Sequence, residues 1–166
     1  NWRPTFWDAA ADPASGPGSE AIAAMRPLLE QAALIKCARE EAEWLFGSAD
    51  AAAVSAALPQ RPAVVVSDGG SRLSWCFGGI SGALPAFPVT VADSTGAGDA
   101  FTAGLLHRLC AEPELLGSPG LPVDPQAVVA ALRFAAACGA LVCQGPGAID
   151  PQPDPAQVEA FLAAQA

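Results

Sequence analysis

Short apolar runs alternate with longer segments of helical periodicity along this chain. Strands are predicted where apolar residues are continuous or alternate with polar ones, at 33–36, 63–67, 73–77 and 87–91. The run at 63–67 is apolar almost throughout, which is typical of a central parallel strand. Because these strands alternate with helical segments, the pattern predicts an α/β fold with a mainly parallel sheet.

Capping residues and prolines mark the ends of the predicted helices. Ser19 can cap a first helix extending to about residue 33, which Pro27 should kink or shorten. Asp124-Pro125 and Asp154-Pro155 each place a capping carboxylate before a proline, which is a strong start signal. Further helices are predicted at 39–46, ending at Gly47, at 50–58, at about 100–109 and at 126–143, the last of them buried on most sides.

The stretch from Ala92 to Phe101 carries the clearest chemistry. The predicted strand at 87–91 enters a tight glycine turn, and an apolar helix follows. This arrangement presents free backbone N–H groups at the positive end of the helix dipole, where a phosphate binds well. Asp99 lies in the first helical turn beside that place. An anion cradle with an adjacent base is the minimum equipment for moving a phosphoryl group onto a hydroxyl.

Composition and charge narrow the classes of protein to consider. The chain has 166 residues, of which 52% are hydrophobic and 15% charged, so it fits one globular domain with a real core. Its net charge is −9, and its basic residues form no stripe. This argues against nucleic acid or an anionic membrane surface as a partner. No run approaches the ~18 uninterrupted apolar residues expected of a membrane span.

The five cysteines and the first residue bear on the compartment and on completeness. The cysteines are scattered in apolar segments without a Cys-x-x-Cys pair, and there is one histidine, so a zinc site is not expected. We interpret them as reduced, buried thiols in a cytoplasmic compartment. The chain begins at Asn1, and the aromatic segment 1–7 is expected to finish a strand that starts upstream. A missing signal peptide therefore says nothing about the parent protein.

The spacing in the glycine turn excludes two common phosphate loops. A Walker A loop needs a lysine, and none lies near. A dinucleotide fingerprint starting at Gly96 would need a glycine where Phe101 stands. What remains is Asp-Ser-Thr-Gly-Ala-Gly-Asp followed by Ala-Phe-Thr-Ala-Gly. This sequence closely resembles the second signature of the ribokinase-like carbohydrate kinases, the PfkB family.

Other stretches agree with that family in order and spacing. Residues 1–7 resemble a segment of its fructokinase branch, and residues 35–47, 65–69 and 134–149 are similar to later family segments. The resemblance implies a ribokinase-like three-layer α/β/α sandwich. It implies that 1–166 is the C-terminal part of the kinase domain, and that the N-terminal half with the sugar-binding region and lid is absent from this chain.

The resemblance implies ATP-dependent phosphorylation of a sugar, with Asp99 as the catalytic base. The N–H groups of Gly96, Ala97 and Gly98 would form an anion hole over the transferred phosphoryl group. Judged from the residues alone, Asp99 could instead be an ordinary acidic residue at a helix start. The glycines could likewise be an ordinary tight turn.

The resemblance also implies roles in nucleotide and metal binding. Glu41 would hold Mg²⁺ through water, and Asp93 with Thr95 would hold a monovalent cation such as K⁺. Read without the family, Glu41 could belong to a solvated acidic helix face, and Asp93 could simply cap the turn. Carbonyl groups of Val142, Gly145 and Gly147 would complete the cation site, and the nucleotide would contact Lys36, Ser67, Asp68, Gly69, Gly70, Arg72 and Ala136.

Several departures from the family pattern keep a second hypothesis open. Ala38 and Ala136 replace polar residues, Arg72 replaces a glycine, and Pro151 replaces a further cation ligand. These changes would suit a non-catalytic nucleotide-binding scaffold or regulator. His107 matches no family role and is expected to be structural or on the surface. Sugar and ATP are the expected partners, homodimerisation of the full-length protein stays open, and the isolated chain is expected to have little or no kinase activity.

Overall fold

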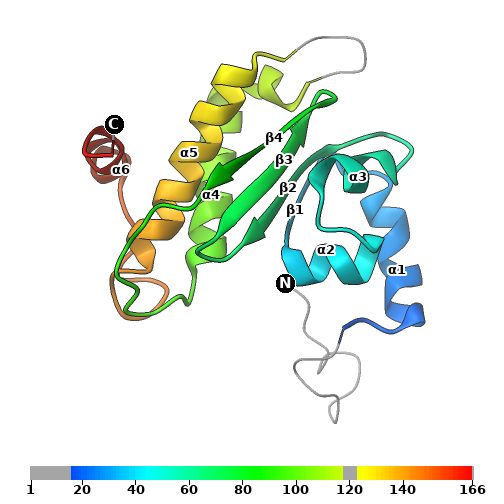
Figure 1. The fold of residues 1–166 in the computed structure, drawn as a ribbon, viewed down its shortest axis with the longest axis horizontal. Coiled ribbons are helices and arrows are strands. Elements are labelled where there is room, and N and C mark those ends of the chain that lie inside the picture. Colours follow the sequence, from blue (N-terminus) through cyan, green and yellow to red (C-terminus); the bar gives the residue numbers. More distant parts are fainter. Residues whose placement is uncertain (1–15, 118–122, 166) are drawn as a thin grey trace. The chain divides into compact units, whose positions relative to one another are not determined.

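The computed structural model describes residues 16–117 and 123–165 (Figure 1). The chain divides between Ala83 and Leu84 into two compact units, each of which is described by itself. The strand expected at 1–7 lies outside the described residues.

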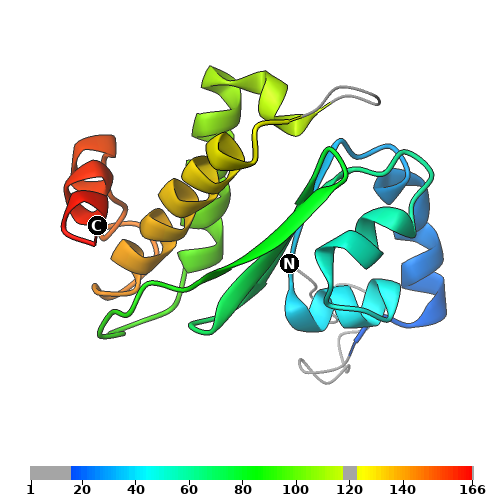
Figure 2. The same cartoon turned by 45° about the horizontal axis from the view of Figure 1, so that its top comes forward.

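The first unit is built on a four-stranded sheet with strand order β1-β2-β3-β4 (Figures 1 and 2). β1 runs parallel to β2, and β2 runs antiparallel to β3. The expected mainly parallel sheet is therefore wrong for the described part, which is mixed. The reason is the short turn at 69–71, which can join only antiparallel neighbours, whereas two helices connect β1 to β2. The strands are β1 (Leu34–Ala38), β2 (Ala63–Asp68), β3 (Arg72–Phe77) and β4 (Ile80–Pro85).

The strand expected at 87–91 is not formed, and this prediction was wrong. The hairpin after β3 returns at once as β4, and Val91 is 59% exposed. An extended segment becomes a strand only when its N–H and C=O groups pair with a neighbour, and Pro88 has no N–H to offer. Phe87 is instead held by side-chain packing. Its ring meets Phe161 edge-on at 5.2 Å, and Arg133 lies 5.1 Å above it.

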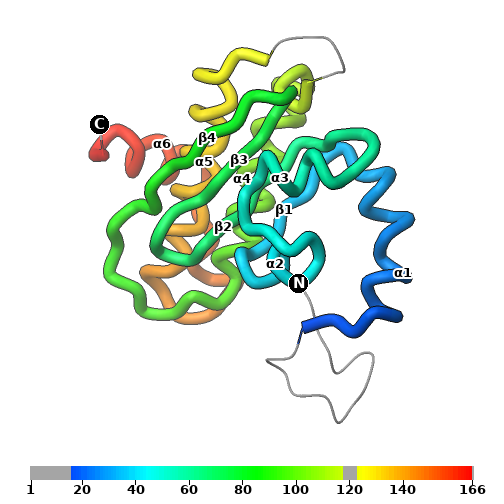
Figure 3. Tube along the Cα trace, turned by 45° about the vertical axis from the view of Figure 1, so that its right-hand side comes forward, coloured from blue at the N-terminus to red at the C-terminus, as the bar shows by residue number. Residues whose placement is uncertain are grey.

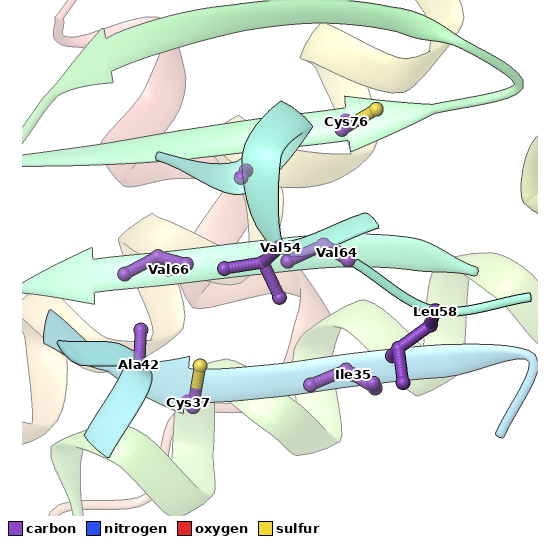
Figure 4. Close-up of a cluster of buried hydrophobic side chains, with 9 residues drawn as sticks. Ile35, Cys37, Ala42, Val54, Leu58, Val64, Val66 and Cys76 are labelled. Carbon is purple, nitrogen blue, oxygen red and sulfur yellow. The ribbon is translucent and has the colours of Figure 1, made fainter. Parts of the chain in front are cut away.

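Helices α2 (Arg39–Phe46) and α3 (Ala51–Ala56) cover one face of this sheet. Figure 4 shows Ala42, Val54 and Leu58 directed at the strand residues of that face, which include Val64 and Val66. Alternate residues of a strand point to the same face, so one face of β1, β2 and β3 supplies the sheet side of this core, with Cys76 as the contribution of β3. Gly47 ends α2 with a φ of 69°, as expected, and the Asp50 carboxylate accepts from the Ala53 N–H at 2.8 Å to start α3.

Helix α1 (Ser19–Leu29) is shorter than expected and begins differently. Gly18 occupies the capping position, and Ser19 lies inside the helix. The helix ends two residues after Pro27, which agrees with the expectation that this proline shortens it.

The second unit consists mainly of three helices, α4 (Ala97–Ala111), α5 (Pro125–Val142) and α6 (Pro155–Ala163). A 3₁₀ helix over Pro113–Leu116 follows α4. α4 and α5 lie side by side, and α6 packs against α5 (Figures 1 and 3). Asp124 and Asp154 accept from the N–H groups of Gln126 and Gln157 at 2.9 and 2.8 Å, which confirms both predicted starts. The buried core includes Ala100, Phe134, Ala137, Cys138, Val142 and Val158.

Helix α5 is long and apolar enough to cross a membrane by length and composition alone. It is not an uninterrupted apolar run, because it contains Gln126 and Arg133. Half of its residues are buried inside the protein, however, and the core helix of a soluble protein passes the same test. The packing of α5 against α4 and α6 gives that ordinary explanation.

The five cysteines differ in accessibility, and this makes the fold testable. Cys37, Cys76 and Cys138 are buried, whereas Cys110 is exposed, so the prediction of uniformly buried thiols was wrong at Cys110. Burial raises the pKa of the Cys37 thiol to about 11, with a smaller contribution from the Glu41 charge. Since the thiolate is the reactive form, Cys37 should be protected twice, by access and by protonation.

We expect iodoacetamide at pH 8 to label Cys110 in the folded chain and Cys37 only after unfolding in guanidinium. Mass spectrometry of the digested protein measures both sites, and Cys110→Ser provides the control by removing the fast reaction. Rapid labelling of Cys37 under native conditions would show that the core between α2 and the sheet is not formed as described.

Candidate active site

The glycine turn leads directly into α4 and leaves several amide groups without partners. Gly96 adopts a φ of 82°, in the left-handed region that favours glycine. The Ala97 N–H donates to the Ser94 carbonyl at 3.2 Å, and the Ala100 N–H donates to the Gly96 carbonyl at 2.9 Å. The amides of Gly96, Gly98 and Asp99 donate to no residue within 16–117 and 123–165. They are therefore available to an anion, whereas the Ala97 amide, expected in the anion hole, is already used by the turn.

The Asp99 carboxylate lies in the first turn of α4 and is exposed. Within the described part of the chain no side chain is hydrogen-bonded to it. A carboxylate at this place gains from the positive end of the helix dipole, and it can still accept a proton from a ligand hydroxyl. The geometry thus places one exposed base beside a group of unpaired amides.

Asp93 joins the turn to the loop that follows α5. Its Oδ1 accepts from the Thr95 N–H at 2.9 Å and from the Thr95 hydroxyl at 2.7 Å. Its Oδ2 accepts from the N–H of Gly147 at 2.9 Å. The N–H groups of Ala92 and Asp93 also donate to the carbonyl of Cys143 at 2.7 and 3.3 Å. Hydrogen bonds therefore join the glycine turn to the loop after α5, although the two segments lie more than fifty residues apart in sequence.

Close backbone contacts add to these bonds. A Cβ atom on Gly96 would lie 2.7 Å from the Cβ of Ala148, so only glycine allows the two segments to approach this far. On the other side of the turn, the Ala97 carbonyl oxygen lies 3.0 Å from where a Cβ of Gly139 would stand. The start of α4 is thus packed against both α5 and the loop after it.

The residues expected to hold a monovalent cation are partly assembled. Asp93, Thr95 and Gly147 lie together, as the bonds above require. The carbonyl of Val142 already accepts from the Gly145 N–H at 3.2 Å, and Pro151 packs beside Gly145. Nowhere in the described residues do three or more His, Cys, Asp or Glu side chains gather in a way that could hold a metal ion.

The hydrogen bonds to Asp93 have a measurable acid–base consequence. The Thr95 N–H and hydroxyl, together with the Gly147 N–H, lower the pKa of Asp93 below its ordinary value. A carboxylate with a lowered pKa in the folded state contributes stability above its unfolded pKa of about 3.9, and loses it as the pH falls through the folded value.

We therefore expect Asp93→Asn to be less stable than the unmodified chain at neutral pH, and the difference to shrink as the pH falls below about 4. Urea unfolding at several pH values measures this difference. A difference that stayed constant down to about pH 2 would mean that the charge of Asp93 does not matter.

The residues expected to contact the nucleotide in the first unit do not share one face of the sheet. Lys36 and Ala38 pair with Val65 and Ser67 in the parallel register, so Lys36 and Ser67 lie on the same face. Asp68 follows Ser67 and points the other way, together with Arg72, its partner on β3. The sequence could not separate these sets, because the exact end of β2 and its pairing with β3 decide the faces.

Asp68 and Arg72 line a hollow of about 420 Å³ on the face covered by α2 and α3. Arg39 bridges the carboxylates of Asp68 and Glu43 at 3.3 and 3.0 Å, and these bonds raise the pKa of its guanidinium. The helical spacing of Arg39 and Glu43 could have suggested one of these pairs from the sequence. The pair with Asp68 could not be predicted without knowing that β2 ends at Asp68 beside the start of α2.

Three further expected residues have identifiable surroundings. The Glu41 carboxylate accepts from the Ala38 N–H at 2.9 Å, which caps the start of α2. Ala136 is half-buried in α5. His107 is exposed and stacks on Phe134 with ring centroids 5.7 Å apart, which confirms a surface and packing role.

Most of the chain is similar to known proteins. The family described as "pfkB family carbohydrate kinase" matches residues 7–155. Fructokinase-1 of Zea mays is 32% identical over 142 residues, which cover 84% of this chain and 42% of that protein. The chain thus spans less than half the length of this relative.

Solved structures show the same relationship. A fructokinase double mutant from Vibrio cholerae O395, in its fructose-, ADP- and potassium-bound form, aligns with a TM-score of 0.73 and 29% identity, over 86% of this chain and 44% of its own. The ATP-bound fructokinase from Xylella fastidiosa aligns with a TM-score of 0.75 and 26% identity, over 99% and 50%. The ribokinase-like fold, the glycine turn with Asp99 and the match over most of the chain lead to one conclusion: this chain belongs to the pfkB family of carbohydrate kinases.

Proposed function

We propose that the protein transfers the γ-phosphoryl group of ATP to a sugar hydroxyl, as a kinase of the fructokinase type. The observation that supports this most is the group of unpaired amides at Gly96, Gly98 and Asp99 with the exposed Asp99 carboxylate beside them. An anion hole needs donors that are directed before the reaction begins, because they then stabilise developing charge without rearranging.

In the proposed reaction the sugar oxygen attacks the γ-phosphorus while the bond to the β–γ bridging oxygen breaks. ADP leaves with that electron pair, and the hydroxyl proton passes to the Asp99 carboxylate. The amides of the turn would carry the charge on the equatorial phosphoryl oxygens. Little covalent work is asked of the protein, so positioning and electrostatics dominate.

ATP in this proposal lies along Lys36 and Ser67, with the chain turn at Gly69 and Gly70 allowing close approach. Lys36 lies in the middle of β1 and Ser67 near the end of β2, and ligands bind at the C-terminal ends of parallel strands in α/β sheets. Asp68 and Arg72 face the opposite side, so we assign the nucleotide to the Lys36 and Ser67 face. Ala136 would leave recognition of the base mainly apolar.

In this proposal metal ions would be held through oxygen ligands at two separate places, and not by a cluster of acidic side chains among the described residues. The Glu41 carboxylate, which accepts from the Ala38 N–H at the start of α2, would hold Mg²⁺ through water. When bound, Mg²⁺ supplies positive charge to the phosphate oxygens. Asp93 and the hydroxyl oxygen of Thr95 keep lone pairs for K⁺.

A non-catalytic nucleotide-binding scaffold is the second candidate. The observation that favours it is that Arg72 lies away from the Lys36 and Ser67 face, while Ala38 and Ala136 offer no polar side chain to the nucleotide. In both cases the scattered thiols without disulfides support a cytoplasmic compartment.

A coupled assay for ADP with a panel of sugars, ATP, Mg²⁺ and K⁺ separates the candidates. The full-length protein should turn over at least one sugar, with fructose as the first choice. Nucleotide binding without any sugar-dependent ADP release would favour the scaffold. The 166-residue chain, which spans under half of the Zea mays relative, should show little or no turnover.

A further inference from the structure

We propose that Asp93 and Gly147 form a clamp that holds the anion-binding turn in its working shape without help from a bound cation. This inference rests on the proposed function, in which the turn binds the transferred phosphoryl group. Asp93 is then a positioning residue in its own right.

The first argument is the number of protein donors that one carboxylate receives. Three donors reach Asp93, two from Thr95 on Oδ1 and one from Gly147 on Oδ2, all within 2.9 Å. Hydrogen bonds to a charged acceptor are roughly twice as strong as neutral ones. Each oxygen serves a different segment, so the carboxylate bridges the segments through protein atoms alone.

The second argument is where these bonds act. Thr95 directly precedes Gly96, so its two bonds fix the peptide that enters the turn. Gly147 directly precedes Ala148, whose Cβ lies against the Cα side of Gly96. Gly147 itself has a φ of 79°, a conformation that other residues rarely adopt and that sets the direction in which the chain continues from its N–H to Ala148. The clamp therefore seats Ala148 against the turn.

The consequence concerns the amides of Gly96, Gly98 and Asp99. These amides have no acceptor among the described residues, so no hydrogen bond of their own fixes the direction of their N–H groups. Their direction depends on the path of the backbone, which the clamp fixes from both flanks. A turn that is already ordered before the phosphate arrives loses less conformational freedom on binding.

A role limited to cation binding predicts a different result, and Asp93→Asn distinguishes the two. Asparagine keeps one acceptor for Thr95, but its NH₂ group then faces the N–H of Gly147, where two donors repel. This change breaks the bridge whether or not a cation is present. Thr95→Val removes the hydroxyl donor alone, and Thr95→Ser restores it.

The first measurement uses NMR hydrogen exchange on the 166-residue chain in buffer whose only cation is N-methylglucamine. The Gly147 and Thr95 amides should be protected in the unmodified chain, and Asp93→Asn should reduce this protection by about tenfold or more. Asp150→Asn, an exposed carboxylate that takes no part in the clamp, is the matched control. Unprotected Gly147 and Thr95 amides in the unmodified chain without K⁺ would overturn the proposal. If Asp93→Asn does not fold, Thr95→Val and Thr95→Ser provide the same comparison at the Thr95 amide.

The second measurement uses the full-length protein with and without K⁺. A clamp predicts that Asp93→Asn lowers kcat by about 10- to 100-fold in both buffers, with a smaller change in KM for ATP, because the phosphoryl group is misplaced. A defect that appears only with K⁺ would show a cation ligand and no clamp. If the exchange result holds but no variant or parent phosphorylates a sugar, the clamp stands and the proposed function fails.

Discussion

Replacing Asp99 by asparagine is expected to lower sugar phosphorylation by about 10²- to 10⁴-fold, the range that a positioned general base contributes. The asparagine side chain keeps the size and polarity of the original but cannot take the proton from the sugar hydroxyl. Because Asp99 is exposed and no described side chain bonds to it, the fold should survive. The loss should therefore fall on kcat, with nearly unchanged affinity for ATP.

Steady-state kinetics on the full-length protein measure this effect, and circular dichroism with thermal unfolding confirms the fold. Asp150→Asn is the matched control, since it removes the same charge from an exposed residue outside the turn. Turnover by Asp99→Asn within a factor of a few of the parent would remove Asp99 from the mechanism. It would also leave the turn as an anion site without a base, as the scaffold hypothesis requires.

Replacing Gly96 by alanine is expected to disrupt the turn itself. The left-handed backbone at a φ of 82° costs a non-glycine residue about 1–2 kcal/mol. The added Cβ would lie 2.7 Å from the Cβ of Ala148 and 3.0 Å from its Cα, an overpacking that typically costs a further ~1–3 kcal/mol. The turn must then move away from Ala148, and the unpaired amides move with it.

Urea unfolding and titration with an ATP analogue measure both effects. Gly79→Ala is the control for the backbone term, because Gly79 has a φ of 83° with nothing within 4 Å of an added Cβ. We expect Gly96→Ala to lose more stability than Gly79→Ala and also to lose nucleotide affinity. Equal losses in the two variants, with nucleotide binding intact, would show that the contact with Ala148 does not shape the site.

Local sequence signals predicted most of the helices and their ends. Asp124, Asp154 and Gly47 mark boundaries through bonds between neighbours in sequence, and such bonds need no tertiary context. The run at 63–67 was correctly placed as a strand for a similar reason, since its continuous apolar character requires burial on both faces.

The strand predicted at 87–91 is not formed, because local sequence signals do not report whether a strand has a partner to pair with. A strand exists only where a partner offers matching N–H and C=O groups. The hairpin through Gly78 and Gly79 makes β4 the neighbour of β3, so the position beside β3 is already occupied. The expected nucleotide residues lie on opposite faces of the sheet for a related reason. Neighbouring positions in a strand point to opposite faces, so Ser67 and Asp68 belong to different sides.

The sequence by itself determined the residue types of the glycine turn and, through them, the family. The spacing of Asp93, Gly96, Gly98 and Asp99 indicated the family, and the match over residues 7–155 confirms it. Only the tertiary structure shows which amides stay unpaired and which distant segment the Asp93 carboxylate bonds to. Its bond to Gly147 spans 54 positions, and a contact of that range leaves no periodic or local trace in the chain. The residue types of the turn follow from local geometry. The hydrogen bond that holds the turn to the loop after α5 depends on where α5 ends.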